Sequence, residues 1–481
     1  RTTYNTCKQD FSWWQEVNLS SCRGNTMDIS AAKQFMKRLI DKSTSYGFEE
    51  AECCFMQDYS MSVDILNQEV SSYENSNEQG ISFRGKVKGQ MGYASTTSFE
   101  DSAIDFLLKE AYENCLVLDD EDEEFVYCDD NDKELFHDQT TPSFSKNTCA
   151  SFSVVGLSLE KALKDIDPRV TAVDYLSISC GTGPVIVMNS KGLSSYKDSD
   201  YVSIFAEARA TSEGVVKTAG NYWFGNDVDL FDEKKFVDVL GKKLLGKFGA
   251  SSIKSGTYDI ILGNEAFISL LSTFFGSFSS FNMQKGLSLL ADKEGTVIAS
   301  EALTLSEEPM LDKALLKIPF DSEGVRTKSK NIINKGKFET ALYNTKTARK
   351  ANRQSTGNGF RSSYASSVGI LTTNIVIKPD SLDLEGLCKE VNNGIYITDL
   401  NGLHAGVNAI SGDFSLQSEG YLIKDGLLVR PIEQITVADN FFEILKKIRV
   451  VGNDVINYPV DMGEFFSPSI VIDSVSVSGD E

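Results

Sequence analysis

The chain changes character near residues 221–236, NYWFGNDVDLFDEKKF, and this change constrains the fold more than any single motif. Before it, helix-like stretches alternate with strand-like stretches, a pattern typical of helices packed on a mostly antiparallel sheet. Beyond about residue 295, short strand-like runs alternate with glycine-rich turns, which indicates a β-rich domain. With 481 residues the chain has room for two domains. We therefore predict an α+β protein with an N-terminal α/β domain at 27–225 and a β-rich C-terminal domain with few helices at 230–481.

Within the first domain, apolar spacing predicts helices over residues 29–46, 99–116 and 157–166. Residues 80–101 predict a β-hairpin, in which Gly85 and Gly89 supply the turn conformations.

Within the second domain, an amphipathic helix is predicted over 232–248, and a buried strand at 256–262 runs directly into a further helix. The pair Asp425-Gly426 predicts a tight hairpin turn, because both residue types tolerate positive φ. Residues 438–448, ADNFFEILKKI, predict a capped helix.

Several features indicate a cytoplasmic protein. No apolar run approaches the roughly 20 residues of a membrane-spanning helix, and the nine cysteines are scattered without a CxxC pair, as expected of reduced thiols. Cys53 and Cys54 are expected to lie in a strand and to pack in the protein core. Residues 1–26 are polar and lack the apolar centre of a signal peptide, and a helix pattern begins after Met27. We interpret 1–26 as an expression leader or a disordered tail.

The formal net charge of −22 argues against general nucleic-acid binding, which requires basic surface to displace counterions from phosphates. The acidic run at 119–134 lacks the ligand spacing and central glycine of an EF-hand, so a solvated linker is favoured over a calcium site. Residues 324–361 are basic instead. Two interpretations remain for this basic segment, a groove for an anionic ligand or nucleic acid and, the one we favour, a solvated face that balances nearby acids.

The stretch LLSTFFGSF at 270–278 contains candidate polar residues, since it lies in the helix that follows the buried strand. Leu270, Leu271, Phe274 and Phe278 form its apolar face. Its remaining side chains offer only small hydroxyls. The chain has two histidines, His137 and His404, so no zinc-protease motif of the HExxH type exists anywhere in it.

Two loops contain other candidates. Residues 355–364, STGNGFRSSY, combine glycines with hydroxyl side chains and allow close approach of a peptide or phosphate, but they are not a P-loop. In the segment 394–423, His404 has Asp413 and serines nearby in sequence, so a Ser-His-Asp hydrolase can be drawn. A GxSxG elbow is absent, and a structural histidine is favoured.

The ordered set of segments resembles one family, the TldD/PmbA proteins, also known as modulators of DNA gyrase or peptide-maturation metalloproteases. The resemblance covers about residues 28–450 and rests on GISFRGKVKGQMGYAST, on YDIILGNEAFISLLSTFFGSFSSF, on ALYNTKTARKANRQSTGNGFRSSY and on GIYITDLNGLHAGVNAISGDFSLQSEG. No one of these is diagnostic alone, but their order is specific.

In the TldD branch of that family, the helix after Leu-Gly-Asn carries His-Glu-x-x-x-His. The resemblance implies that the two imidazoles bind a catalytic metal and that the glutamate acts as general base on metal-bound water. In the present chain, Ser272, Thr273 and Ser277 stand at the positions of His, Glu and His, and Gly276 is kept. Neutral hydroxyls replace neither the imidazole ligands nor the carboxylate base. The chain thus resembles the PmbA/TldE branch, which lacks the metal.

The resemblance also implies a partner. TldD and TldE proteins form a heterodimeric protease that degrades unfolded or extended peptides and removes leader segments, and the TldE subunit contributes scaffold and part of an enclosed cavity. A zinc-type metal is then expected only in a TldD-like partner, this chain would have no cofactor, and a homodimer is one option for the chain alone. Extended peptides would be held by strand addition, with no contact to nucleic acid or membrane. The candidates for cavity lining or interface are Gly357, Asn358, Gly359, Arg361, His404 and Asp413.

Three functions therefore stay open. The favoured one is the metal-free subunit of a heterodimeric metalloprotease. The second is a self-sufficient hydrolase that uses Ser272 or Ser277 with His404. The third is a non-enzymatic regulator that binds DNA gyrase, or DNA through Arg349 and Lys350.

Overall fold

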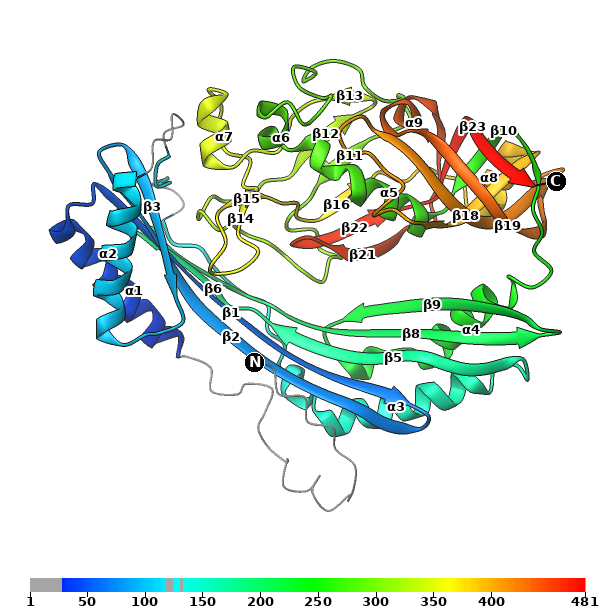
Figure 1. Ribbon diagram of the computed structural model, residues 1–481, viewed down its shortest axis with the longest axis horizontal. Coiled ribbons are helices and arrows are strands. Elements are labelled where there is room, and N and C mark those ends of the chain that lie inside the picture. The colour runs from blue at the N-terminus through cyan, green and yellow to red at the C-terminus, as the bar shows by residue number, and fades with distance from the viewer. Residues whose placement is uncertain (1–27, 118–123, 130–132, 481) are drawn as a thin grey trace. The chain divides into compact units, whose positions relative to one another are not determined.

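The computed structural model describes residues 28–117, 124–129 and 133–480, so the predicted leader at 1–26 lies outside the described residues. The chain forms two compact units (Figure 1). Of the described residues, the first comprises 28–117, 133–248 and 363–365. The second comprises 124–129, 249–362 and 366–480. Each unit thus includes a short segment from the other half of the sequence.

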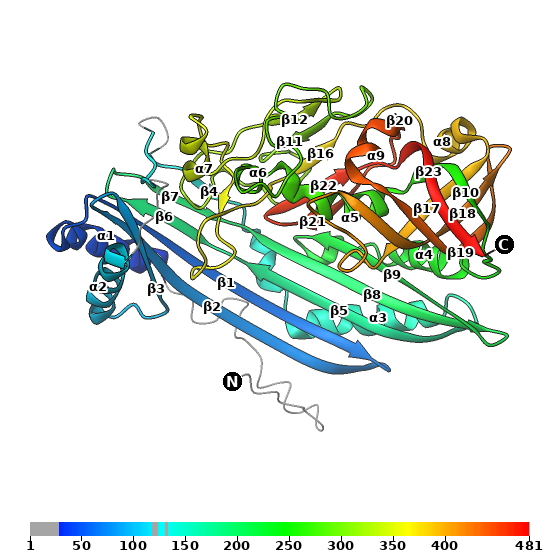
Figure 2. The ribbon, with the colours of Figure 1, turned by 45° about the horizontal axis from the view of Figure 1, so that its top comes forward.

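The first unit is built on a nine-stranded sheet in the order β4-β7-β6-β1-β5-β8-β9, with β2 paired to β1 and β3 to β2. Long strands run side by side through its centre (Figure 2). Only the β4–β7 pair is parallel, which confirms the mostly antiparallel prediction. The strands are β1 Glu50–Leu66, β2 Glu69–Val87, β3 Gln90–Thr96, β4 Phe136–Asp138, β5 Val170–Thr182, β6 Val185–Asn189, β7 Ser194–Asp198, β8 Asp200–Ser212 and β9 Val215–Gly225.

The first unit has two hydrophobic cores, and the odd-numbered side chains of β1 contribute to both. The α-helices of this unit therefore pack on one side of β1. Cys53 and Phe55 enter the core that α1 and α2 cover. Met61 and Val63 enter the core that α3 and α4 cover. The helices are α1 Ile29–Ser43, α2 Asp101–Val117, α3 Cys149–Lys164 and α4 Glu233–Leu245, with short 3-10 turns η2 Thr44–Tyr46, η3 Pro142–Lys146 and η4 Val228–Leu230.

Three predictions for this unit differ from the structure. The boundary lies at Phe248 rather than at residues 225–230, because α4 buries Leu240 and Leu244 in the core of the first unit. Helix α3 begins at Cys149 rather than at 157, since Thr148 forms a capping box ahead of it. Gly85 is not a turn residue. It lies within β2, where an added Cβ would meet the Phe48 ring at 2.4 Å.

The second unit contains a closed ring of strands. β10 pairs with β17 on one side and with β23 on the other, and β17, β18, β19 and β23 pair in succession, so the ring has no free edge. β20 pairs with β23 outside the ring. These strands are β10 Lys254–Leu262, β17 Gly394–Asn401, β18 Asp413–Lys424, β19 Leu427–Asn440, β20 Ile448–Val451 and β23 Ile470–Asp480.

A second sheet of this unit has the order β13-β12-β11-β16-β22-β21, and β14 and β15 form a separate pair. The strands are β11 Leu305–Glu307, β12 Lys330–Asn334, β13 Lys337–Phe338, β14 Gly359–Phe360, β15 Gly369–Ile370, β16 Ile375–Ile377, β21 Ile456–Val460 and β22 Gly463–Ser467. The helices are α5 Asn264–Phe274, the 3-10 turn η5 Phe275–Phe278, α6 Ser280–Gln284, α7 Thr345–Lys350, α8 Leu384–Val391 and α9 Phe441–Lys447. The unit is β-rich with short helices, as predicted.

Local predictions for the second unit are confirmed. Asp425 and Gly426 have φ of 51° and 74°, the two positive values that a type I′ hairpin turn needs. The side chain of Asn440 accepts hydrogen bonds from the first turn of α9 and caps that helix. Among the described residues, no helix combines the length and the apolar composition needed to cross a membrane.

Candidate functional site

The helix that follows the buried strand is fixed at its first residue. Gly263 joins β10 to α5, and an added Cβ there would lie 2.9 Å from the carbonyl oxygen of Ile397, so only glycine fits without a shift. The side chain of Asn264 donates a hydrogen bond of 2.8 Å to the carbonyl of Asp454. Strand, turn and helix therefore form one rigid unit.

The predicted apolar face of this helix is confirmed. Leu270, Leu271, Phe274 and Phe278 are each at most 2% exposed. The Phe274 ring stacks on Phe441, with centroids 4.7 Å apart and planes at 12°. The helix thus packs against α9 and belongs to the main core of the second unit.

The three hydroxyl residues on this segment have different surroundings. The hydroxyls of Ser272 and Thr273 both donate to the carbonyl of Ser269, at 3.0 and 2.8 Å. They are therefore satisfied within their own helix. Ser277 lies beyond the end of α5, in η5, and is only 4% exposed. Its Oγ is buried and has no hydrogen-bond partner.

These donors do not fit a catalytic metal. Zinc in proteins takes imidazole, thiolate or carboxylate ligands, and hydroxyls that stay neutral near pH 7 are poor substitutes. Throughout the part of the chain that the structure describes, no three His, Cys, Asp or Glu side chains cluster closely enough to hold a metal ion. The two histidines of the sequence lie in different units, His137 on β4 and His404 after β17.

A small hollow of about 170 Å³ lies beside two of the three hydroxyl residues, entirely within the second unit. Thr273 and Ser277 belong to its lining, whereas Ser272 does not. None of the lining side chains is ionisable, so the hollow suits an uncharged group. The other lining residues are Phe274, Gly276, Asn282, Leu287, Ala409 and Ile410.

The wall formed by residues 276–290 is held by its own hydrogen bonds. The Asn282 side chain donates to the carbonyl of Gly276 at 2.8 Å. The Ser288 hydroxyl donates to the carbonyl of Ser277 at 2.7 Å. The backbone oxygens on this side of the hollow are therefore satisfied, and the Ser277 hydroxyl remains the unsatisfied group.

The opposite wall is the loop between β17 and β18, which contains the predicted candidate His404, and the other candidate, Asp413, is the first residue of β18. Asp413 accepts hydrogen bonds from the side chains of Ser411 at 2.8 Å and Asn440 at 2.9 Å. The bonds from Asn440 and then from Ser411 lower the pKa of the Asp413 carboxyl. Because Asn440 also caps α9, Asp413 ties the loop to that helix.

The geometry gives no support to a Ser-His hydrolase. A serine nucleophile needs a base within hydrogen-bonding reach, but the hydroxyls of Ser272 and Thr273 point to their own helix. His404 is exposed, and among the described residues it has no hydrogen bond or ion pair. Ser277 has no imidazole beside its hydroxyl.

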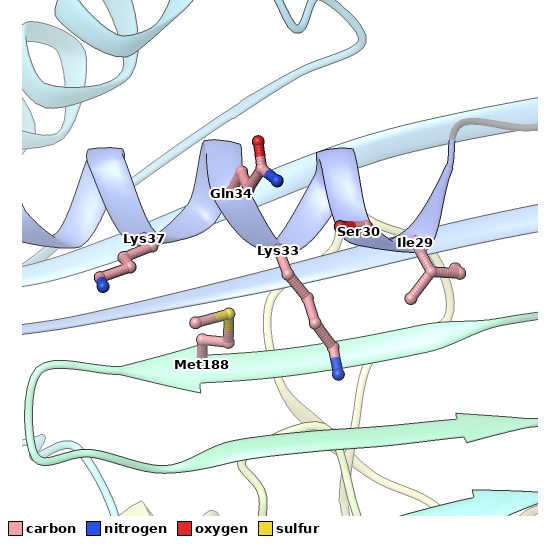
Figure 3. A pocket seen from close by; sticks show the side chains of 6 residues that line it. All are labelled: Ile29, Ser30, Lys33, Gln34, Lys37 and Met188. Atoms are coloured by element: carbon pink, nitrogen blue, oxygen red, sulfur yellow. The ribbon is translucent and has the colours of Figure 1, made fainter.

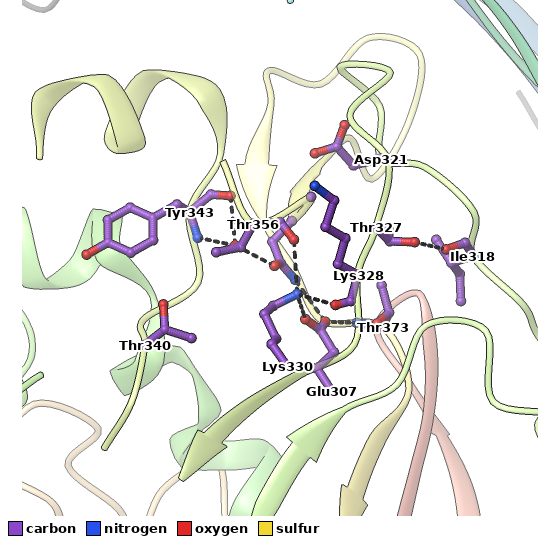
Figure 4. A network of polar contacts seen from close by, with 12 residues as sticks. Glu307, Ile318, Asp321, Thr327, Lys328, Lys330, Thr340, Tyr343, Thr356 and Thr373 are labelled. Atoms are coloured by element: carbon purple, nitrogen blue, oxygen red, sulfur yellow. Dashed lines mark hydrogen bonds and ion pairs between the residues drawn. The ribbon is translucent and has the colours of Figure 1, made fainter. Parts of the chain in front are cut away.

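The glycine-rich candidates lie in a different place, where Asn358 and Gly359 bond to Glu307 and Asp321 of a polar network (Figure 4). The side chain of Asn358 donates to Glu307 at 2.8 Å and to the carbonyl of Leu371 at 2.9 Å. Glu307 forms an ion pair of 2.5 Å with Lys330. Asn358 and Glu307 are therefore paired, whereas the buried Oγ1 of Thr373, whose backbone N–H donates to Glu307, has no hydrogen-bond partner.

The flanking candidates are fixed by the same network. The backbone N–H of Gly359 donates to Asp321 at 2.8 Å. Burial, and then the neighbouring Glu323 carboxylate, raise the pKa of Asp321 well above its ordinary value. Arg361, 2% exposed, donates to the carbonyl of Ser366 at 2.7 Å. Gly357 has φ of 75°, and all four candidates from Gly357 to Arg361 are buried. Their role in lining a cavity stays a prediction.

The basic segment 324–361 is largely engaged by acids and aromatic rings of its own unit. Lys346 pairs with Glu124 at 2.9 Å. The guanidinium of Arg349 lies 5.2 Å from the centre of the Phe125 ring. Arg353 forms an ion pair with Glu294. The interpretation that this segment balances nearby acids is favoured over a nucleic-acid groove, and residues 124–129 of the acidic run pack against it rather than being fully solvated.

A larger hollow, of about 390 Å³, lies along α1 in the first unit (Figure 3). Its lining comes from one strip of α1 and from Met188 on β6, and Lys33 points past the strand rather than toward a second polar group. Size alone does not make it a reactive site, because no convergent set of polar groups lies there. It is lined by Ile29, Ser30, Lys33, Gln34, Lys37 and Met188.

Sequence reasoning missed the residues that complete the small hollow. Leu287 and Ile410 are 42% and 46% exposed, and Phe281 and Leu289, next to the lining in sequence, are 49% and 55% exposed. The one available signal was the run FNMQKGLSLL at 281–290, in which large apolar residues flank a turn at Gly286. Exposed apolar residues in such turns are informative.

Comparison with known proteins gives a consistent result over nearly the whole chain. Three models of PmbA/TldA metallopeptidase domains match, the first domain at residues 51–115, the central domain at 153–247 and the C-terminal domain at 255–479. A metalloprotease PmbA homologue of Haemophilus influenzae is 25% identical, with 96% of this chain and 99% of that protein aligned. A metalloprotease TldD homologue of Buchnera aphidicola is 28% identical over 58% of this chain and 61% of its own length.

Solved structures agree with this result. A candidate modulator of a DNA gyrase from Thermotoga maritima has a TM-score of 0.82 and 26% identity, and the match covers 93% of this chain and all of that one. TldE from Thermococcus kodakarensis also has a TM-score of 0.82, covering 92% of this chain and 100% of its own, and at 22% identity it shows the shared fold. The chain therefore belongs to the PmbA/TldD family of metallopeptidases.

Proposed function

We propose that this chain is the metal-free, PmbA/TldE-like subunit of a heterodimeric protease that acts on unfolded or modified peptides. The observation that carries the proposal is the set of hydroxyls at Ser272, Thr273 and Ser277. By resemblance, these are the positions at which a metal-bearing relative has two imidazoles and a carboxylate. Two of the hydroxyls are bonded to their own helix and the third is buried without a partner, so none is arranged as a ligand or a base.

Similarity to both branches of the family supports the proposed heterodimer. The chain is similar to proteins named PmbA and to proteins named TldD, and it shares its fold with a TldE. A chain without the donors for a metal can contribute to metalloprotease activity only as a scaffold or as a substrate-binding surface. The metal, the general base and the activated water would then all be supplied by a TldD-like partner in the cytoplasm.

The test is reconstitution with a paralogue that carries His-Glu-x-x-x-His. We expect no stoichiometric zinc in the purified chain by elemental analysis, and no cleavage of an unfolded, fluorophore-labelled casein by the chain alone. Addition of the paralogue should produce cleavage that a chelator abolishes. The matched control is the paralogue with its motif glutamate replaced by glutamine, which should form the same complex without activity. Cleavage by the isolated chain that resists chelators would overturn the proposal.

The gyrase hypothesis has weaker support. The name of the Thermotoga maritima relative suggests it, but the net charge of −22 opposes direct contact with DNA. Arg349, one of the two cations suggested for such contact, already lies over Phe125. A DNA mobility shift that weakens with salt and is lost on Arg349→Ala would favour this alternative.

A further inference from the structure

We infer that the hollow at the former ligand positions is a binding subsite for one uncharged, apolar side chain of an extended peptide. This inference rests on the proposed function, because it assigns the peptide-binding role of the chain to a particular place. The subsite combines a hollow of matching size, a neutral lining and a buried hydroxyl that lacks a partner.

The size of the hollow selects the occupant. A cavity of about 150 Å³ is large enough to hold a benzene molecule, so about 170 Å³ accommodates one leucine, methionine or phenylalanine side chain. Phe274, Leu287 and Ile410 provide apolar contacts. A charged side chain would lose its hydration there without gaining a counter-charge, because no lining residue is ionisable.

The apolar surface continues outside the hollow. Leu287 and Ile410 are partly exposed where they line it, and Phe281 and Leu289 flank the same turn with about half of each side chain exposed. Lys285 lies over the Phe281 ring at 5.9 Å from its centre and leaves the remaining apolar residues uncovered. An extended chain that inserts one side chain can therefore rest its neighbouring residues on this rim.

Ser277 is the second, independent sign of a ligand. A buried hydroxyl without a hydrogen bond is unfavourable, and at 4% exposure Ser277 has little access to bulk water. The nearby backbone oxygens of Gly276 and Ser277 are already occupied by Asn282 and Ser288. A polar atom of a bound peptide would provide the missing partner.

Both walls are rigid enough to hold the subsite open. The side chain of Asn408 accepts hydrogen bonds from the backbone N–H groups of Ile410 and Ser411, each at 3.1 Å. The backbone N–H of Gly412 donates to the Asn408 carbonyl at 2.9 Å. Because the loop is fixed before any ligand arrives, little conformational entropy is lost on binding.

The experiment measures binding of a blocked peptide series Gly-Ser-Gly-X-Gly-Ser-Gly to the isolated chain by saturation-transfer difference NMR. With X as leucine or phenylalanine, we expect at least a ten-fold lower Kd than with alanine, since several methylene-sized groups become buried. Aspartate or lysine at X should bind no better than alanine. Equal affinity across the series, or no binding at all, overturns the inference.

Two matched variants locate the preference. Ala409→Trp places a large ring at the lining and should remove the preference for leucine over alanine. Ala405→Trp makes the same change at an exposed position of the same loop, outside the lining, and should retain it. Thermal unfolding of both variants checks that they fold. A preference that survives Ala409→Trp in a folded protein contradicts the assignment.

The hydroxyl is tested separately. Ser277→Ala should weaken binding of the leucine peptide by about five-fold, the loss expected for one hydrogen bond. Unchanged affinity would rule out Ser277 as a ligand contact. The proposed function is tested by peptide cleavage in the presence of the paralogue, so the function and the subsite can fail separately. Peptide binding without cleavage in the complex overturns only the function, and cleavage that is insensitive to Ala409→Trp, with no leucine preference, overturns only the subsite.

Discussion

Two polar regions of the second unit differ in what surrounds their buried polar groups. Around Asn358, a buried carboxylate, a partly buried ammonium and the glycine-rich backbone have partners at hydrogen-bonding distance, and one hydroxyl, that of Thr373, has none. Around Ser277, a buried hydroxyl has no partner and lies beside a hollow. Paired charges and amides stabilise and order the fold, whereas an unpaired group beside a hollow leaves binding capacity for a ligand.

The difference explains why the glycine-rich segment 355–364 is not the better candidate site. Glycines and hydroxyls at 355–364 suggested close approach of a ligand, but the group that approaches the backbone of Gly359 is the chain's own Asp321. The segment 270–278, which includes Ser277, has no charged residue. It was a candidate only because it follows the buried strand. An unsatisfied hydroxyl that borders a hollow, rather than polar composition, singles out the region around Ser277.

The largest effect should come from breaking the network around Asn358. Glu307→Ala removes the carboxylate that pairs with Lys330 and accepts from Asn358. Loss of one partner of a buried ion pair costs about 3–5 kcal/mol, and the lower end of that range is expected here because the remaining charge, on Lys330, is 13% exposed. Urea denaturation should show this loss in the free energy of unfolding.

The matched control for that substitution is Glu308→Ala, one residue further along. Glu308 is partly exposed, and its side chain has no hydrogen bond or ion pair among the described residues. We expect a change within about 0.5 kcal/mol, as for an ordinary surface position. Similar losses at both positions would mean that the network is not what stabilises this unit.

A smaller and sharper contrast compares two buried serines. The Ser280 hydroxyl donates to Thr347 at 2.8 Å, and Ser280 is 1% exposed. Ser280→Ala should therefore cost about 1 kcal/mol in urea denaturation. Ser277→Ala removes a hydroxyl without a partner and should leave stability unchanged or slightly raised. If Ser277→Ala is as destabilising as Ser280→Ala, the hydroxyl has a partner in solution and the comparison between the two regions fails.

Much of the fold was predictable because local signals and tertiary structure agree. The helix at 264–274, the Asp425-Gly426 turn and the cap of α9 each follow from short-range chemistry, and all three are confirmed. The domain boundary was not predictable, because α4 is an amphipathic helix whose sequence does not reveal which of the two neighbouring cores it joins. Gly85 was misassigned to a turn for a similar reason. Glycine is needed there because an added Cβ would meet the ring of Phe48, which is 37 positions away in the sequence.

The candidate site was only partly predictable. Ser277 and Thr273 were identified through their position relative to the family motif, and both line the hollow. Ala409 and Ile410 were not identified, because they reach the hollow from a loop more than 100 residues further along the chain. No local pattern encodes such a meeting of distant segments, and the unpaired state of one hydroxyl is visible only in three dimensions.

The smallest expected effect concerns the loop that forms the second wall. Asn440 and Ser411 donate to the Asp413 carboxylate and lower its pKa in the folded protein. The unfolded chain, with a pKa of about 3.9, then takes up a proton first as the pH falls. The stabilisation is therefore complete above about pH 5 and is lost as the pH falls through the folded-state pKa. Asp413→Ala should lower Tm modestly at pH 6–7, and its Tm should approach that of the unmodified protein near pH 3. Glu301→Ala, at an exposed carboxylate without a partner among the described residues, should show no such convergence. A Tm difference for Asp413→Ala that stays constant across this range would show that the carboxylate does not hold the loop to α9, and the rigid wall on which the subsite depends would lose its support.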